Sequence, residues 1–492
     1  MEPTGTMSDP DPCWWSAQEA AAAIARRRIS AREYLRALTD RIEAHNGPLG
    51  LVVTLDERAE AAARRADDAL ARGEVRGPLH GVAMTVKDSM ATRGLRTTGG
   101  MTELRSFTPV EDAAVVAGLR AAGAVIFGKT NLPAGSADLQ SFNDVFGTAR
   151  NPWRPEYSTS GSSGGGAGAV AAGFTPAEVG SDIAGSVRLP AAACGVVGHK
   201  PTFGTVSMYG HVPPAPFRNL MLDIAVPGPM GRCVDDVLLA LRAIAGPHPW
   251  DRAAWQLAFP PPREIRRVAV WSDDAYCPVD REVRDAVEQA ATALAEQGIT
   301  VEHATPRGIQ LETSDLVFRR LLAAAAVNNH PLDVIEQIGE GRREPGAELG
   351  AAHVGQRYRH WSDAEERRAQ LRLRWRSFFQ TYDALLLPVS ASLTIPHDHR
   401  PFAARRIRVD GVERPYWDQV TWAGLTGVAY LPSTVVPVRL DSRGLPVGVA
   451  VAGGHLEDMT TLAVARLLAT LLPPLGRPPM PDRTMATTGA GA

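Results

Sequence analysis

The stretch Ser158-Thr-Ser-Gly-Ser-Ser-Gly-Gly-Gly-Ala-Gly168, followed by Gly180-Ser-Asp-Ile-Ala-Gly-Ser-Val-Arg188, is the most unusual part of this sequence. Runs rich in glycine and serine most often form flexible linkers. Here, however, apolar helix and strand patterns follow without a break, and the second glycine-rich turn comes within one supersecondary unit. A solvated linker does not normally lie inside such a unit. The sequence therefore favours two structured turns in the core of the chain.

Two short catalytic or binding motifs match this stretch only in part. Gly166-Ala-Gly-Ala-Val-Ala171 fits a loose dinucleotide fingerprint, and Gly161-Ser-Ser-Gly-Gly165 fits the nucleophile elbow of α/β hydrolases. Both motifs require a buried strand immediately before them. The preceding residues Pro155-Glu-Tyr-Ser-Thr-Ser160 do not have a strand pattern. The sequence therefore disfavours both motifs.

Lysine is rare in this chain, which makes each lysine informative. Of 52 lysines and arginines, only Lys87, Lys129 and Lys200 are lysines. This bias most simply reflects a GC-rich coding sequence. Arginine is effectively never deprotonated, whereas a desolvated lysine can become a neutral base. A position that keeps lysine in such a chain is therefore a candidate for that role.

The serine-rich turns and the lysine-bearing strand together resemble the amidase signature family. Ser162 and Ser186 are 24 residues apart, as in the family pattern, and Gly81-Val-Ala-Met-Thr-Val-Lys87-Asp88 matches the strand that carries the family's lysine. The other matching blocks are Gly128 to Asn131, Asn151 to Trp153, Gly161 to Gly165, Gly180 to Pro190, Cys194 to Thr202, Pro227 to Gly231 and Gly444 to Gly448. The resemblance thus extends over nearly the whole chain and includes all three lysines.

The resemblance implies a serine hydrolase that cleaves carbon–nitrogen bonds of amides and, in some members, carbamates (urethanes) or esters. A serine hydroxyl is a poor nucleophile until a base takes its proton. By resemblance, Lys87 is the neutral base and Ser162 relays the proton after a cis Gly161–Ser162 peptide bond. Ser186 then forms the acyl-enzyme. The scheme implies no cofactor and no metal ion.

The resemblance also implies which groups support the reaction. The oxyanion is expected to accept hydrogen bonds from the backbone N–H groups of Ile183, Ala184, Gly185 and Ser186. Asp182 and Arg188 are expected to pair and brace this loop, and Ser163 to donate to Lys87. The chain departs from the family pattern where glycine is usual, at Ala184 and Ser160. Alanine keeps its N–H group, while the serine could narrow the site.

Alternating short strands and helices predict an α/β protein. The resemblance implies a large mixed, mostly parallel twisted sheet with helices on both faces. We expect one domain over 14–475, with an N-terminal helical layer at 14–75 and a catalytic core at 78–240. Residues 308–422 form its variable substrate-shaping region, and 476–492 a disordered tail.

Several elements can be predicted individually. Ser16 and Ser30 each precede a glutamate by three residues, the capping-box pattern of a helix start. Residues 82–86 have a strand pattern that ends at Lys87. The stretch 308–376 is predicted to be helical, and 397–414 to be an irregular surface excursion.

Composition limits the partners. A net charge of −2 offers no long-range attraction for nucleic acid or for an anionic membrane surface. No apolar run reaches the ~18 residues that span a bilayer, and the N-terminus lacks a secretory layout. The four cysteines form no CxxC pair. We therefore expect a cytoplasmic protein that binds neither nucleic acid nor membranes and is a monomer or homodimer. The family resemblance implies a small amide or carbamate substrate, and Phe142, Phe146, Trp417 and Trp422, in the segments expected to shape the pocket, favour an apolar or aryl group.

Two alternatives stay open. One is the glutaminase subunit of a tRNA-dependent amidotransferase, which shares the core, although the residues Leu132 to Gln140 differ from that subunit's usual continuation. The other is a catalytically inactive binding protein on the same fold. The complete set of Lys87, Ser162 and Ser186 argues against the second alternative.

Overall fold

The computed structural model describes residues 9–212, 222–326, 332–340 and 353–480. Most of the predicted tail, 476–492, lies outside these residues. Within them, no helix is both long and apolar enough to cross a membrane.

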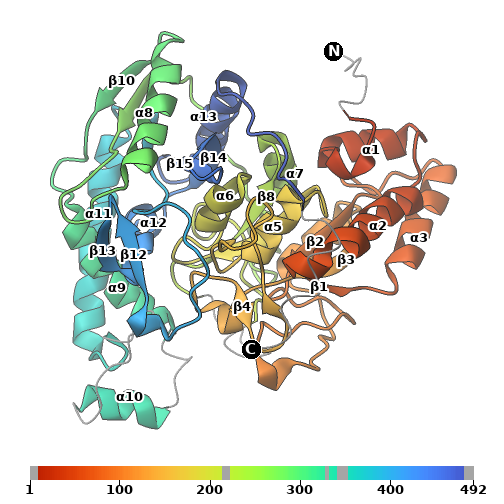
Figure 1. Ribbon diagram of the computed structural model, residues 1–492, viewed down its shortest axis with the longest axis horizontal. Coiled ribbons are helices and arrows are strands. Elements are labelled where there is room, and N and C mark those ends of the chain that lie inside the picture. The colour runs from red at the N-terminus through yellow and green to blue at the C-terminus, as the bar shows by residue number, and fades with distance from the viewer. Residues whose placement is uncertain (1–8, 213–221, 327–331, 341–352, 481–492) are drawn as a thin grey trace.

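Among the described residues, one sheet of eleven strands forms the centre of the molecule (Figure 1). In spatial order its strands are β1 (Val52–Leu55), β3 (Val125–Thr130), β2 (Ala83–Lys87), β6 (Ala177–Asp182), β8 (Val226–Gly231), β7 (Val197–Lys200), β14 (Ser433–Leu440), β15 (Pro446–Ala452), β11 (Ala384–Pro388), β9 (Arg267–Val270) and β10 (Thr300–His303). Strands from residue 52 to residue 452 share this sheet, which supports our proposal that 14–475 form one domain.

The mixed sheet with flanking helices agrees with the prediction, but its strand directions need a correction. Parallel pairs occur in two groups, β3-β2-β6 and β11-β9-β10. The other six neighbouring pairs, including all those from β6 to β15 and on to β11, are antiparallel. Parallel neighbours need a long crossover, whereas a short turn makes its strands antiparallel. The turn between β14 and β15 is such a reversal.

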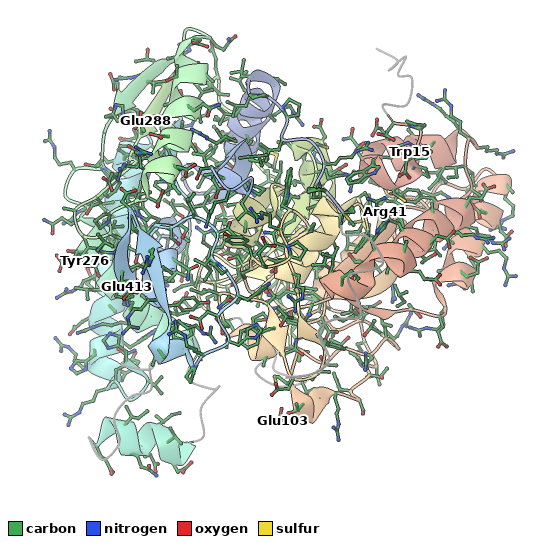
Figure 2. The ribbon with its side chains drawn as sticks, viewed as in Figure 1. Trp15, Arg41, Glu103, Tyr276, Glu288 and Glu413 are labelled. Atoms are coloured by element: carbon green, nitrogen blue, oxygen red, sulfur yellow. The ribbon has the colours of Figure 1, made fainter. Side chains whose placement is uncertain are left out.

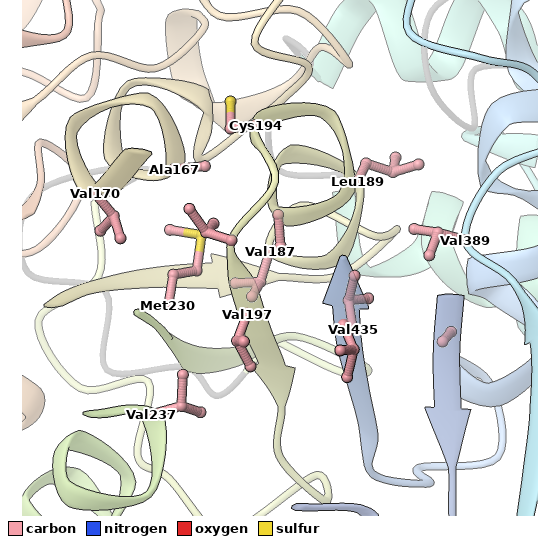
Figure 3. Close-up of a cluster of buried hydrophobic side chains, with 14 of the residues drawn as sticks. Ala167, Val170, Val187, Leu189, Cys194, Val197, Met230, Val237, Val389 and Val435 are labelled. Carbon is pink, nitrogen blue, oxygen red and sulfur yellow. The ribbon is translucent and has the colours of Figure 1, made fainter. Parts of the chain in front are cut away.

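Helices cover both faces of the sheet. They are α1 (Ala17–Ala25), α2 (Ala31–Leu49), α3 (Ala59–Ala71), α4 (Ala114–Ala121), α5 (Gly164–Ala171), α6 (Arg188–Cys194), α7 (Val234–Ile244), α8 (Arg281–Ala295), α9 (Leu311–Ala326), α10 (Leu332–Gly339), α11 (Tyr358–Phe378), α12 (Thr421–Gly427) and α13 (Asp458–Leu471). Met230 of β8 faces α5, while the next residue, Gly231, faces Val237 of α7 (Figure 3). Successive strand residues point to opposite faces, so α5 and α7 lie on opposite sides.

The N-terminal helices begin where the sequence predicts. Ser16 and Ser30 both form complete capping boxes with the glutamate three residues later. Figure 2 shows Arg41 on α2. Its Nε donates to the carbonyl of Ala172, just after α5, at 2.8 Å. This bond ties the helical layer to the core.

The prediction for the segment 397–414 is wrong in part. Residues Arg406–Val409 (β12) and Val412–Pro415 (β13) form an antiparallel hairpin. Its two turn residues, Asp410 and Gly411, both have positive φ, at 48° and 82°. An Asp-Gly pair suits the tight turn of a hairpin. Ile407 and Val409 are buried and alternate with exposed residues, as in a strand. The strand pattern is short and lies among many arginines, so the segment reads as polar and irregular in the sequence.

Candidate active site

Lys87 ends β2 with its side chain fully buried. Its Nζ lies 2.6 Å from Ser162 Oγ and 3.1 Å from Ser181 Oγ. Burial lowers the pKa of Lys87 to about 7, although the negative charges of Asp182 and Glu178 act in the opposite direction. Desolvation disfavours the charged form of an amine. Neutral Lys87 is therefore accessible near neutral pH, next to two hydroxyls.

Ser162 lies in a turn just before α5, and the Gly161–Ser162 peptide bond is cis. Ser160 has a φ of 61°, in the left-handed region. A Cβ atom on Gly161 would lie 2.7 Å from the carbonyl carbon of Leu139, so only glycine fits there. Ser141 Oγ donates to the carbonyl of Ser160 at 3.0 Å and accepts from the N–H of Gly164 at 3.0 Å. These contacts fix the turn.

Close backbone packing explains the glycines after Ser162. A Cβ atom on Gly164 would lie 2.3 Å from Thr159 Oγ1, and one on Gly165 would lie 2.4 Å from the nitrogen of Asn131. The glycine run is therefore the N-terminal part of a buried helix that touches the chain leaving β3. It is not a linker.

Ser186 lies in the second turn, between β6 and α6, and is buried. The N–H of Ser163 donates to the carbonyl of Ser186 at 3.1 Å, which joins the two serine-rich turns. Among the described residues, no hydrogen bond links the hydroxyls of Ser162 and Ser186. The structure thus brings Lys87 and Ser162 into contact and places Ser186 in the adjoining turn. The predicted hydrogen bond from Ser186 to Ser162 is not formed.

The predicted oxyanion hole needs a correction at Gly185. Its N–H donates to Asp182 Oδ1 at 2.8 Å, and its φ is 101°. Because this N–H already donates to the Asp182 carboxylate, it is not available to an oxyanion. In the described part of the chain, the N–H groups of Ile183, Ala184 and Ser186 have no hydrogen-bond partner. They are the remaining candidates for binding an oxyanion.

Asp182 and Arg188 form a buried ion pair beneath this turn. Arg188 donates from Nε and Nη2 to the two carboxylate oxygens at 2.9 and 2.8 Å. Burial acts to raise the pKa of Asp182, but the charge and hydrogen bonds of Arg188 lower it to about 2. Arg188 also donates to the carbonyl of Ala423 and to Thr426 Oγ1, both in α12. The pair therefore links the turn that holds Ser186 to a distant helix.

The second hydroxyl at the lysine comes from Ser181 and not, as predicted, from Ser163. Ser163 Oγ donates to the carbonyl of Ser181 at 3.3 Å and accepts from the N–H of Ser181 at the same distance. The side chain of Ser163 thus points at the backbone of β6. Ser181 lies beside Asp182 in the same glycine-rich block, so the sequence held a signal for it.

One further neighbour of this group had no signal in the sequence. His211 is buried, and its Nε2 lies 2.9 Å from Ser181 Oγ and 3.1 Å from Ser89 Oγ. The histidine lies outside every block that carries the family resemblance. Only the folded chain brings it to the lysine.

A small cavity of about 40 Å³, partly open to solvent, lies beside the turn that precedes Ser162. Apolar and small side chains form most of its wall, with hydroxyls and one amide among them. Its lining includes Ser158, Ser160, Leu189, Ala192, Val389, Ser392, Leu393, Ile395 and Gln419. Ser392 Oγ is buried and has no partner in the described residues. Figure 3 shows Leu189 of α6 and Val389 pointing toward each other.

Comparisons with known proteins cover almost the whole chain. The model of the family described as Amidase matches residues 33–462, a range that contains Lys87, Ser162 and Ser186. A Glutamyl-tRNA(Gln) amidotransferase subunit of Anaeromyxobacter sp. (strain K) is 35% identical over 504 residues, covering 95% of this chain and 98% of that protein.

Solved structures agree with this match. The crystal structure of an amidase is 28% identical with a TM-score of 0.78, covering 93% of this chain and all of that one. The 6-aminohexanoate cyclic dimer hydrolase in complex with substrate is 26% identical with a TM-score of 0.76, covering 95% of this chain and 99% of that one. Proteins of the same fold are thus named for different activities.

Proposed function

This chain belongs to the amidase family, whose members are hydrolases of carbon–nitrogen bonds, and on that premise we propose that it cleaves an amide through an acyl-enzyme on Ser186. The observation that carries the proposal is the buried Lys87 amine, 2.6 Å from Ser162 Oγ. A neutral amine in that place can accept the serine proton at neutral pH.

In the first half of the reaction two protons move along the relay, one carbon–oxygen bond forms and the carbon–nitrogen bond breaks. Neutral Lys87 accepts the proton of Ser162, which in turn accepts the proton of Ser186. The Ser186 oxygen attacks the carbonyl carbon, and the N–H groups of Ile183, Ala184 and Ser186 stabilise the oxyanion. When the carbon–nitrogen bond breaks, the proton returns through Ser162 to the leaving amine. Water then attacks the acyl-enzyme by the same route and releases the acid.

Glutamine is the first candidate substrate, because the curated relatives favour the amidotransferase alternative over a stand-alone amidase. The amidotransferase subunit of Anaeromyxobacter is 35% identical to this chain, and the alignment extends over nearly the full length of both proteins. In this role the chain would release ammonia from glutamine and act with partner subunits on glutamyl-tRNA(Gln). The charge of −2 means that tRNA contacts would come from the partners.

A small amide or carbamate with an apolar or aryl group is the second candidate. It is supported by the cavity beside Ser160 and Leu189, whose wall is mostly apolar with a few hydroxyls. Ligand sites commonly combine an apolar wall with few polar groups. In this role the chain would act alone, as a monomer or homodimer. For either role we propose a cytoplasmic enzyme.

A substrate panel on the purified chain separates these candidates. Labelling by a fluorophosphonate probe, lost in Ser186→Ala, tests the nucleophile first. Ammonia release from glutamine, measured with and without the co-expressed partner subunits, is then compared with turnover of anilides, fatty amides and carbamates. Glutamine turnover that requires partners supports the first candidate, and anilide turnover by the chain alone supports the second. No labelling and no turnover of any substrate would refute the acyl-enzyme.

A further inference from the structure

We propose that His211 is a positioning residue for the base Lys87 and that it acts through the hydroxyl of Ser181. The inference rests on the proposed function, in which Lys87 activates the serines. His211 Nε2 lies 2.9 Å from Ser181 Oγ, which lies 3.1 Å from Lys87 Nζ. The three side chains are buried. The ring is therefore two hydrogen bonds away from the amine.

The backbone holds the ring in this place. His211 pairs with Met90 in an isolated antiparallel bridge. Two backbone hydrogen bonds join the segments on either side of the bridge: Val212 N–H to the carbonyl of Ser89 at 2.6 Å, and Ala91 N–H to the carbonyl of Gly210 at 2.9 Å. The residues Ser89 to Ala91 follow soon after Lys87 in the chain. The histidine and the lysine are thus carried by segments that are fastened to each other.

The direction of the hydrogen bonds gives the histidine its role. A neutral amine has two N–H donors and one lone pair. The lone pair must face the hydroxyl hydrogen of Ser162, so Ser181 Oγ has to accept an N–H from Lys87. The proton of Ser181 then needs another acceptor. In the tautomer that leaves Nε2 unprotonated, His211 supplies one, and this nitrogen lies nearer to Ser181 Oγ than to Ser89 Oγ, at 2.9 against 3.1 Å. Without that acceptor, the Ser181 hydroxyl hydrogen can turn to the lone pair of Lys87 and compete with Ser162.

A matched pair of substitutions tests this role. His211→Phe keeps a ring of similar size but removes the acceptor, whereas His211→Gln keeps an acceptor near the position of Nε2. The measurements are the rate of Ser186 labelling by a fluorophosphonate and the kcat and KM of the best amide in the panel. We expect His211→Phe to lower the labelling rate and kcat about tenfold, the effect of one hydrogen bond, with KM within about twofold. His211→Gln should recover most of the loss.

A control and a second background complete the test. His248→Phe replaces another buried histidine, whose ring packs edge-on against Tyr209 and Trp250, and should leave both rates unchanged. If His211 acts only through Ser181, His211→Phe should change the rates less than about twofold in a Ser181→Ala background. An undiminished tenfold effect in that background would overturn the inference.

The outcomes separate this inference from the proposed function. A wild-type chain that is neither labelled nor active refutes the proposed function. A wild-type chain that is labelled, with His211→Phe labelled equally fast, refutes only the role of His211. Thermal unfolding of each variant reports its folding, and His211→Leu gives the same comparison where the phenylalanine ring does not fit.

Discussion

At the scale of single residues, the proposed chemistry depends on one amine that burial has removed from water. Lys87 is fully buried, and its Nζ lies near two hydroxyls. Arginine supplies nearly every other cation in this chain. Because arginine stays protonated, it cannot replace a lysine that must be neutral.

Substitution of the base tests this directly. We expect Lys87→Arg to lower kcat/KM of amide hydrolysis by about 10²-fold or more, the usual effect of losing a general base. Steady-state kinetics of the purified variant measure the loss. Lys129→Arg, the same change at another fully buried lysine whose Nζ donates to Thr92 Oγ1 and not to Ser162, is the matched control. Near wild-type rates in Lys87→Arg would contradict the neutral base.

The pKa of Lys87 also predicts a pH dependence. Burial lowers this pKa to about 7, so the protonated, inactive form dominates below that pH and the neutral form above it. We therefore expect kcat/KM to fall about tenfold per pH unit as the pH drops below about 7, and to level off above it. A pH–rate profile measured with an uncharged amide checks the sign. Activity that stays constant down to about pH 5 would be incompatible with this base.

At the scale of elements, the position of Ser162 depends on how closely α5 approaches its neighbours. Glycines allow the start of this helix to touch backbone, with a Cβ position on Gly165 only 2.4 Å from the nitrogen of Asn131. Alanine would favour the helix by propensity, but the overlap is with backbone that cannot move aside.

Gly165→Ala should therefore reduce stability and activity together. We expect the free energy of unfolding to fall by about 1–3 kcal/mol, the usual range for overpacking. Denaturant titration and the Ser186 labelling rate are the measurements. Gly427→Ala in α12 is the control, since its Cβ would lie at least 3.7 Å from its neighbours. Equal stability of the two variants would show that the start of α5 accommodates a methyl group at residue 165 without steric overlap.

At the scale of the whole molecule, the net charge bears on whether this chain could bind tRNA by itself or only together with partner subunits. The net charge is −2, with no excess of cations for a polyanion. We expect the isolated chain to bind tRNA with a Kd weaker than about 10⁻⁵ M at about 0.15 M salt, in the non-specific range. Fluorescence anisotropy with labelled tRNA measures this. Salt-sensitive binding at nanomolar concentrations would instead show a basic surface within the chain itself.

The sequence by itself determined the family and the kind of fold, and it predicted the reacting groups. The family resemblance predicts the roles of Lys87, Ser162 and Ser186, and local patterns such as the capping boxes at Ser16 and Ser30 located helix starts. These features depend on residues close together in the chain or on a resemblance carried by short blocks. The proposed roles of the three catalytic residues stay predictions that the geometry supports.

Only the tertiary structure decided which groups surround those residues. The use of the Gly185 N–H by Asp182, the contact of Ser181 with Lys87 and the approach of His211 all depend on orientation after folding. The antiparallel centre of the sheet likewise depends on pairing between strands far apart in sequence. A local pattern specifies which way a side chain alternates along its own strand, whereas the partner it meets is set by long-range packing.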